Sequence, residues 1–438
     1  MKKYIILLLF PNLLFAQDSL GLMNAIKLGM WNNYDIKISS KNQDINKIQN
    51  NWANAGALPS INISAKREEV LSDQSNNPAS FIQEKLRSTS YNSNANISWT
   101  LFNGFAIRAN KKKLRNLEKI SDNNSSLTIE NTIQGIILQY YNCVLQKEKL
   151  ELLRKVVKLA KNRLEYEQTR YNIGVSSKID LLQIRNAMLT DSSNIILQEL
   201  NYTNSIKNLN LTLGSDVETK WLLTDTIDTE IKLFSYEDLK ASTLANNTNI
   251  KNQYYNIQLS KQDIKLAISP FYPIISVNSG ASFNETTYDI GNLSSTIGNT
   301  GENINYFANF SVNFRIFDGG KLYNTIRRVK IQKEINKLQY EKIQMEVLHQ
   351  LSLTNDKYNS LITTYSLNQE AFEIAETNYD LATDQKNRGI INSFMLRDIE
   401  IAYITSGINA KQAAYNLMES KIALLKITGG IIQDYQNN

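Results

Sequence analysis

The chain has 438 residues, of which 42% are hydrophobic and 21% are charged, and its formal net charge at pH 7 is +6. This charge is mild for the length, and no dense block of Lys and Arg indicates a nucleic-acid-binding face. Cys143 is the only cysteine, so the fold has to hold without an intrachain disulfide bond.

The N-terminal segment predicts a secretory signal peptide. Two lysines precede an apolar run over residues 4–15, and Ala16 offers a small-residue cleavage point. The run is too short to span a bilayer. The expected exported chain has no uninterrupted apolar run of 18 residues, which argues against transmembrane helices and leaves a β-barrel as the way to enter a membrane.

The remaining sequence repeats itself. One group of positions recurs at an offset of 214 residues and a second group at 215, with the change falling between two predicted strands. We therefore expect two homologous halves. The aligned pairs are Asn33/Asn247, Ile36/Ile250 and Pro59/Pro273, then Phe102/Phe317, Gly104/Gly319, Gly174/Gly389 and Gly214/Gly429. The expected segments are a signal peptide (1–16), a first repeat (17–214), a linker or equatorial collar (215–234), a second repeat (235–429) and a tail (430–438).

Each half is expected to begin with a helix, over residues 19–54 and 235–268, that ends near a proline. Two strands follow, with polar loops expected at 72–90 and 285–303. Asn103 and Asp318 are expected to cap the long helices that come next. The alternating apolar residues that predict the strands are Ile61, Ile63 and Ala65, then Ala95, Ile97, Trp99 and Leu101, and in the second half Ile275, Val277, Ala281, Val312, Phe314 and Ile316.

Four strands are too few to close a barrel within one chain. Their alternation suits a membrane barrel with an apolar outside and a polar lumen. Three chains would supply twelve strands, an even number within the range known for such barrels. The sequence thus predicts a trimeric wall.

The long helices are proline-free over residues 103–171 and 318–386. In both, apolar residues recur at alternating spacings of three and four, which is typical of coiled coils. Both runs reach a glycine, Gly174 or Gly389, suited to a helix C-terminus with positive φ. Ser177 or Asn392 can then begin a returning helix. In each half, the lengths of the long, leading and returning segments favour one continuous long helix beside two shorter helices stacked end to end.

At this point the sequence resembles the TolC-like outer-membrane efflux protein family over essentially all of the expected mature chain. The resemblance rests on the order of five segments: A-I-K-L-G-M-W-N-N-Y-D-I (25–36), A-L-P-S-I-N-I-S (57–64), W-T-L-F-N-G (99–104), R-Y-N-I-G-V-S-S-K-I-D-L-L (170–182) and R-I-F-D-G-G (315–320). It implies a mixed α and β fold, in which four membrane strands per chain complete a trimeric 12-stranded barrel joined to a long α-helical coiled-coil periplasmic tunnel.

The resemblance also implies a function and partners. The chain would be a passive outer-membrane channel of a tripartite efflux or type I secretion system. It would dock to a periplasmic adaptor protein and an inner-membrane transporter of the RND or ABC type, and contact outer-membrane lipid. A structural or adhesive coiled-coil envelope protein without a pore is the alternative that the residues leave open.

The candidate functional residues lie near the two glycine turns. By position in the family, the turns are expected to dock the adaptor, and two carboxylates beyond them to narrow the periplasmic entrance, with two arginines as their partners. Either aspartate is equally well explained as a solvated charge on a helix face. The docking residues are Gly174, Val175, Ser176, Gly389, Ile390 and Ile391, and the entrance residues are Asp180, Asp398, Arg388 and Arg397.

No catalytic, metal or cofactor site can be assembled from the sequence. His349 is the only histidine, and Cys143 occupies an apolar coiled-coil position, where a small core residue is expected. No phosphate-binding loop, G-x-S-x-G or H-E-x-x-H motif is present. An enzymatic function is therefore not expected.

Overall fold

The computed structural model describes residues 19–81, 83–227, 229–290 and 300–431. The predicted signal peptide and most of the predicted tail lie outside these residues. The chain divides into two compact units: a helical unit formed by residues up to 41, 124–251 and from 342 onward, and a sheet unit formed by residues 42–123 and 252–341. None of the helices in the described part of the chain combines the length and apolar content needed to cross a bilayer.

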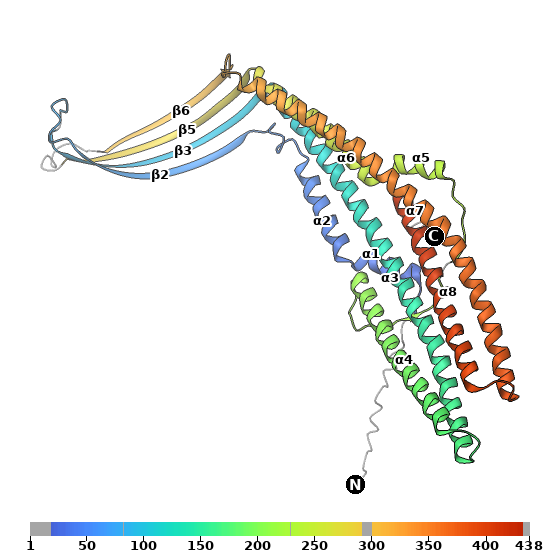
Figure 1. Ribbon diagram of the computed structural model, residues 1–438. Helices are drawn as coiled ribbons and strands as arrows, with labels where there is room; N and C mark the ends of the chain where they lie inside the picture. The colour runs from blue at the N-terminus through green and yellow to red at the C-terminus, as the bar shows by residue number, and fades with distance from the viewer. Residues whose placement is uncertain (1–18, 82, 228, 291–299, 432–438) are drawn as a thin grey trace, which may run out of the picture. The chain divides into compact units, whose positions relative to one another are not determined.

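The sheet unit contains four long antiparallel strands in the order β2-β3-β5-β6, which lie side by side in Figure 1. They are β2 (Ser60–Asp73), β3 (Lys85–Asn103), β5 (Ile274–Ile290) and β6 (Thr300–Asn313). The strands therefore extend well into both predicted polar loops, because cross-strand pairing and not apolar alternation sets their ends. The prediction for Phe314 and Ile316 was wrong, since β6 ends before them.

One face of the sheet is apolar and exposed, and the other is polar. Along β6 the apolar face runs from Val312 through Phe310 and Tyr306 to Ile304, and each of these side chains is more than half exposed. The next residue on that face is Glu302, which lies in a row across the sheet with Glu285, Tyr91 and Arg67. The intervening positions on the opposite face include Asn309, Asn305 and Asn303. The expected alternation is thus confirmed on β6, where the apolar band ends at Glu302. On β3 a register shift between Thr100 and Phe102 breaks it, so Phe102 and not Leu101 pairs with Ile275.

Both predicted cap residues bond the first turn of a long helix, although each helix begins three residues further along the chain. The Asn103 side chain accepts a hydrogen bond from the Ile107 backbone N–H (3.1 Å) at the start of α3 (Ala106–Asn172). The Asp318 side chain accepts one from Leu322 (3.0 Å) at the start of α7 (Lys321–Asn387). These bonds satisfy backbone donors that have no partner within the helix.

The helical unit holds the distal parts of α3 and α7 with the returning helices α4 (Lys178–Leu213) and α8 (Ser393–Ile427). The predicted coiled-coil positions supply its core: Leu150, Val157 and Ala160 on α3 and Tyr358 and Tyr379 on α7 are buried. The predicted collar contributes a two-residue strand, β4 (Leu222–Leu223), which pairs in parallel with β1 (Ser19–Leu20).

The helix that was predicted at the start of each half is broken into two, so the prediction of a single helix in these two segments was wrong. Residues 19–54 form α1 (Leu22–Asn32) and α2 (Tyr34–Gln49), and residues 235–268 form α5 (Tyr236–Asn246) and α6 (Thr248–Ile268). The breaks fall at Asn33 and Asn247, whose ψ angles of 130° and 122° are not helical.

Candidate functional site at the helical tips

The turns that join the long helices to the returning helices have the same geometry in both halves. Gly174 and Gly389 both have φ of 78°, as the sequence predicts. The N–H of the following residue, Val175 or Ile390, donates to a carbonyl five residues earlier at 2.9 Å in each turn. Nothing lies within 4 Å of the Cβ that a side chain would add at either glycine. Glycine is therefore required by backbone conformation and not by lack of space.

Both returning helices begin at the predicted caps. The Ser177 hydroxyl accepts a hydrogen bond from the Asp180 N–H (3.1 Å), and the Asp180 carboxylate accepts one in return from the Ser177 N–H (3.4 Å). The Asn392 side chain accepts from the N–H groups of Phe394 and Met395 at 3.1 and 2.9 Å. Asp180 thus has a structural task of its own, as the acidic member of a capping box.

The predicted docking residues place apolar side chains in solvent. Val175 and Ile390 are 61% and 67% exposed, while Ser176 and Ile391 are half-buried. Ile173 and Ile179 are also largely exposed beside the first turn. Three exposed aliphatic side chains, Ile173, Val175 and Ile179, therefore lie around the first turn.

The predicted entrance residues have different surroundings. Asp398 and Arg388 are exposed, whereas Asp180 is half-buried in its capping box. Arg397 was suggested as a partner of Asp180 or Asp398, but the structure pairs it with Asp191 on α4 and Glu400 on α8. Arg397 therefore belongs to a buried ion-pair network.

This network joins three helices of the unit. Arg163 on α3 makes two hydrogen bonds to Glu400, at 2.9 and 3.0 Å. Arg397 makes two to Asp191, at 2.6 and 2.7 Å, and a third to Glu400 at 2.9 Å. Glu400 is fully buried. Burial acts to lower the pKa of the Arg397 guanidinium, but its hydrogen bonds to Asp191 and Glu400 outweigh that effect and raise the pKa. Two cations and two anions make the network neutral, as burial requires.

Three aromatic rings stack next to the network. Tyr403 lies between Phe372 and Tyr379, with ring centroids 5.6 and 5.0 Å away. The Lys155 ammonium lies 3.3 Å from the Tyr403 hydroxyl, and this hydrogen bond raises the pKa of Lys155. The stack fixes α7 and α8 against each other, and Lys155 adds α3.

Another buried carboxylate, outside this network, lies close to the first turn. Glu167 is 3% exposed, its Oε1 accepts a hydrogen bond from the Ser176 hydroxyl, and its Oε2 has no hydrogen-bond partner. Burial lowers the pKa of Lys386 on α7, while the Glu167 charge partly offsets that effect. Ser176 therefore ties the predicted docking turn to the helix that precedes it.

Charged residues within the apolar spacing of the helices are the sequence signal for these buried groups. Glu167 interrupts the apolar spacing of α3, and Glu400 interrupts that of α8, where Leu396, Tyr403 and Gly407 are buried. A charged residue at a coiled-coil core position calls for a partner of opposite charge. The partners of Glu400 lie as many as 237 residues away, and no spacing in the sequence identifies them.

The remaining candidates for chemistry lie apart from the tips. Cys143 is buried, which raises the pKa of its thiol to about 12, and His349 is exposed. Among the residues that the structure describes, no group of three or more His, Cys, Asp or Glu side chains could hold a metal ion.

Comparison with known proteins places this geometry in context. The family model described as outer membrane efflux protein matches residues 30–215 and 239–430. The probable efflux pump outer membrane protein TtgC of Pseudomonas putida is 20% identical over 90% of this chain and 82% of its own length.

Two solved structures share the fold. The outer membrane channel CmeC of Campylobacter jejuni matches with a TM-score of 0.75 at 16% identity, over 93% of this chain and 85% of its own. The outer membrane protein VceC of Vibrio cholerae matches with a TM-score of 0.70 at 14% identity, over 93% of this chain and 96% of its own.

Proposed function

Because the chain belongs to the outer membrane efflux protein family, we propose that three copies of it form the outer-membrane duct of a tripartite efflux or secretion system. As a member of that family it is a non-enzymatic outer-membrane channel component of an efflux pump.

The sheet carries the argument for a trimer. Its edge strands, β2 and β6, each pair with one neighbour among the described residues, which leaves backbone donors and acceptors open along both edges. Open edges are not tolerated at membrane depth, because no water is there to satisfy them. Pairing β6 of one copy with β2 of the next closes twelve strands from three chains.

The exposed apolar band indicates which part of the sheet lies within the membrane. From Ile304 to Val312 the band on β6 runs about 26 Å along the strand at roughly 3.3 Å per residue. At the strand tilt of roughly 40° found in outer-membrane barrels this corresponds to a height of about 20 Å, compared with about 25 Å for the apolar band of such barrels. We infer that this face meets lipid. The asparagine-rich face then lines a polar lumen.

The tips supply a docking surface for a periplasmic adaptor. Gly174, Val175 and Ser176 form one turn and Gly389, Ile390 and Ile391 the other, and both present a large aliphatic side chain to solvent. The adaptor connects the duct to an inner-membrane transporter of the RND or ABC type.

Asp398 is the better candidate for the periplasmic entrance. It is exposed, so its charge is available to ions, whereas the carboxylate of Asp180 accepts hydrogen bonds from Ser177. One copy of Asp398 from each of three chains would form a ring of like charge that favours cations. Arg388 is also exposed, at the tip of the same hairpin.

Single-channel recording in planar bilayers tests the duct and its entrance together. The wild type should conduct with a preference for cations, and Asp398→Asn should reduce that preference, with Asp384→Asn as the control. A purified protein that forms no channel, and behaves as a monomer by light scattering in detergent, would support the coiled-coil envelope alternative. An unchanged ion preference in Asp398→Asn would leave the duct intact but remove Asp398 from its entrance.

A further inference from the structure

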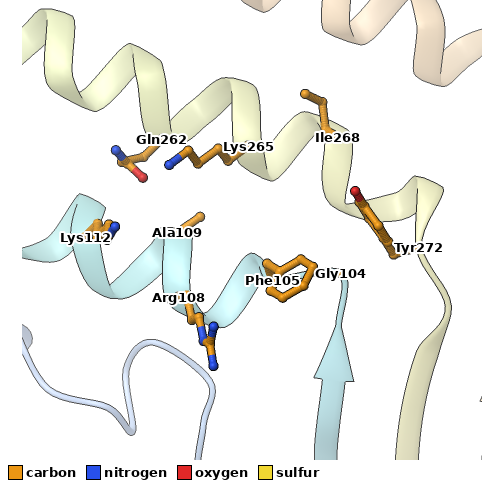
Figure 2. A pocket seen from close by; sticks show the side chains of 9 residues that line it. All are labelled: Gly104, Phe105, Arg108, Ala109, Lys112, Gln262, Lys265, Ile268 and Tyr272. Atoms are coloured by element: carbon orange, nitrogen blue, oxygen red, sulfur yellow. The ribbon is translucent and has the colours of Figure 1, made fainter.

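A basic cavity of about 320 Å³ lies in the sheet unit, between the first turns of α3 and the end of α6 (Figure 2). Its lining combines three cationic side chains, two aromatic rings and one amide, and includes no carboxylate. The lining residues are Gly104, Phe105, Arg108, Ala109 and Lys112, from α3 and the residues just before it, and Gln262, Lys265, Ile268 and Tyr272, from α6 and the residues just after it.

Arg108 lies over the Phe105 ring, 5.9 Å from its centroid, but the two lysines of the cavity have no such role in the fold, in contrast to their neighbours. The Lys111 ammonium donates to the Asn50 carbonyl at 2.8 Å, and Lys113 forms an ion pair with Asp263 at 2.7 Å. Within the described part of the chain, Lys112 and Lys265 form no ion pair, although they lie on the same helices. Like charges gathered without a counter-ion repel one another, so this arrangement favours an anionic ligand.

Gln262 provides a second, independent indication of a ligand. The residue is 8% exposed, and its Oε1 is buried without a hydrogen-bond partner. Figure 2 shows the Gln262 and Lys265 side chains on the side of α6 that faces α3, where Lys112 lies. A buried amide oxygen without a donor costs free energy that a ligand hydroxyl or ammonium group would recover.

The walls of the cavity are held in place by the backbone. Gly104 has φ of 64°, and a Cβ there would lie 2.1 Å from the Ser269 carbonyl oxygen. The backbone just before α3 and the backbone just after α6 therefore approach each other closely at this glycine. Phe105 also has positive φ, 67°, which is rare for a bulky residue. Its ring contacts Phe102 and Tyr272 edge-on, with centroids 5.2 and 5.7 Å away. The aromatic wall is therefore preorganised.

The cavity also lies at a defined level along the sheet. Phe102 pairs with Ile275, the last apolar pair of the band on these strands, and Gly104 and Tyr272 follow within three residues. At roughly 3.3 Å per residue this is within about 10 Å of the end of the band. If the band meets the acyl chains of the periplasmic leaflet, the cavity lies at the depth of their headgroups.

We propose that this cavity binds the phosphate of a glycerophospholipid headgroup from the periplasmic leaflet, and that it prefers a headgroup carrying a hydroxyl or ammonium donor. Lys112 and Lys265 hold the phosphate by charge-assisted hydrogen bonds. Gln262 accepts from the headgroup donor, and the rings of Phe105 and Tyr272 cover the glycerol. The proposal rests on the outer-membrane location of the family and not on conduction.

Native mass spectrometry of the full chain in detergent tests the assignment, with three probes. Phosphatidylglycerol carries the phosphate and hydroxyl donors, phosphatidylmethanol carries the same charge without a donor, and inorganic phosphate lacks the lipid. The wild type should bind them in that order of affinity. Lys112→Gln/Lys265→Gln should weaken phosphatidylglycerol binding roughly 10-fold or more, because two charge-assisted bonds are lost.

The matched variants separate the roles. Lys119→Gln, on the same helix but outside the cavity, should bind like the wild type. Gln262→Leu should bind phosphatidylglycerol no better than phosphatidylmethanol. Equal binding by the double variant and the wild type, or no binding by either, would overturn the site. Inorganic phosphate that displaces the lipid at equal concentration would overturn the lipid assignment. Thermal unfolding without lipid confirms that each variant is folded. Channel recording does not depend on this lipid site, so a failure of the proposed duct and a failure of the lipid site can be told apart.

Discussion

Asn33 and Asn247, which lie 214 residues apart, make the same set of hydrogen bonds in the two halves of the chain. Each side-chain oxygen accepts from the N–H groups two and three residues later, at 2.9–3.2 Å for Asn33 and 3.0–3.3 Å for Asn247. Each amide nitrogen donates to a carbonyl near the end of a returning helix, at 2.9 Å to Thr212 and 3.1 Å to Ile427. Each asparagine thus caps one helix and fastens it to the end of another.

Replacing either of these asparagines should destabilise the helical unit. We expect Asn33→Ala to lower the free energy of unfolding by about 1–2 kcal/mol, the usual cost of losing an N-cap. Asn247→Ala should cost a similar amount, and the two effects should add, because the residues share no partner. Thermal unfolding in detergent measures both. The exposed Asn208 on α4 is the control, and a comparable loss for Asn208→Ala would show that the effect is not specific to the caps.

The buried network should be far more sensitive than a surface ion pair. Arg163→Met leaves Glu400 buried with one partner fewer, and we expect a loss of about 3–5 kcal/mol. Arg163→Met/Glu400→Leu should recover much of that loss, because both charges are removed. Arg154→Met is the matched control on α3: its pair with Glu199 is exposed and should be worth less than about 1 kcal/mol. Equal losses for Arg163→Met and Arg154→Met in denaturant unfolding would contradict this account.

The glycines should differ according to what surrounds them. Gly389→Ala meets no atom within 4 Å and should cost about 1–2 kcal/mol through its positive φ alone. Gly104→Ala adds a clash with the Ser269 carbonyl, so it should greatly reduce the yield of folded protein. Gly301→Ala, which has neither constraint, should fold like the wild type. Expression yield and melting temperature rank the three, and a different order would refute the explanation.

Glu130 should make the helical unit less stable as pH rises. Burial raises the pKa of this carboxyl above its ordinary value near 4.5, although a hydrogen bond from Thr248 and the charges of Lys426 and Lys251 oppose the shift. The folded state therefore holds its proton more tightly than the unfolded chain. This stabilising contribution is complete below the unfolded pKa and is lost as pH rises through the folded pKa.

The conservative variant tests that sign. Glu130→Gln should raise the melting temperature at pH 8 and change it little at pH 4, where the wild-type carboxyl is protonated in both states. Glu237→Gln, at a largely exposed position on α5, should show no such difference between the two pH values. A Glu130→Gln variant that loses stability at pH 8 would mean that the charged form is the stabilising one.

Much of this fold follows from local signals in the sequence. Gly174 and Gly389 mark the turns because positive φ favours glycine, and Asn103 and Asp318 mark helix starts because their side chains satisfy free N–H groups. Asn33 and Asn247 were identified as repeated positions, but their role as breaks was missed. An asparagine inside a helical pattern gives no local sign that a carbonyl from a distant helix lies within reach.

Long-range pairing is what the sequence did not reveal. The strands continue past their apolar stretch because β2, β3, β5 and β6 remain in register through polar residues such as Asn284 and Asn303, which resemble a loop when read singly. Arg163, Asp191 and Glu400 lie on three different helices, and their juxtaposition depends on how those helices pack. Only the position of Glu400 in an otherwise apolar row indicated that a partner was needed.

The two long helices, α3 and α7, each contain 67 residues. An insertion of one residue in either would move its tip by about 1.5 Å and turn it by about 100° relative to the other. The two tips would then no longer present equivalent turns to one partner. Length changes in this lineage are therefore expected to be coupled: insertions or deletions should be inherited in pairs, one per half, and in steps that restore the coiled-coil phase.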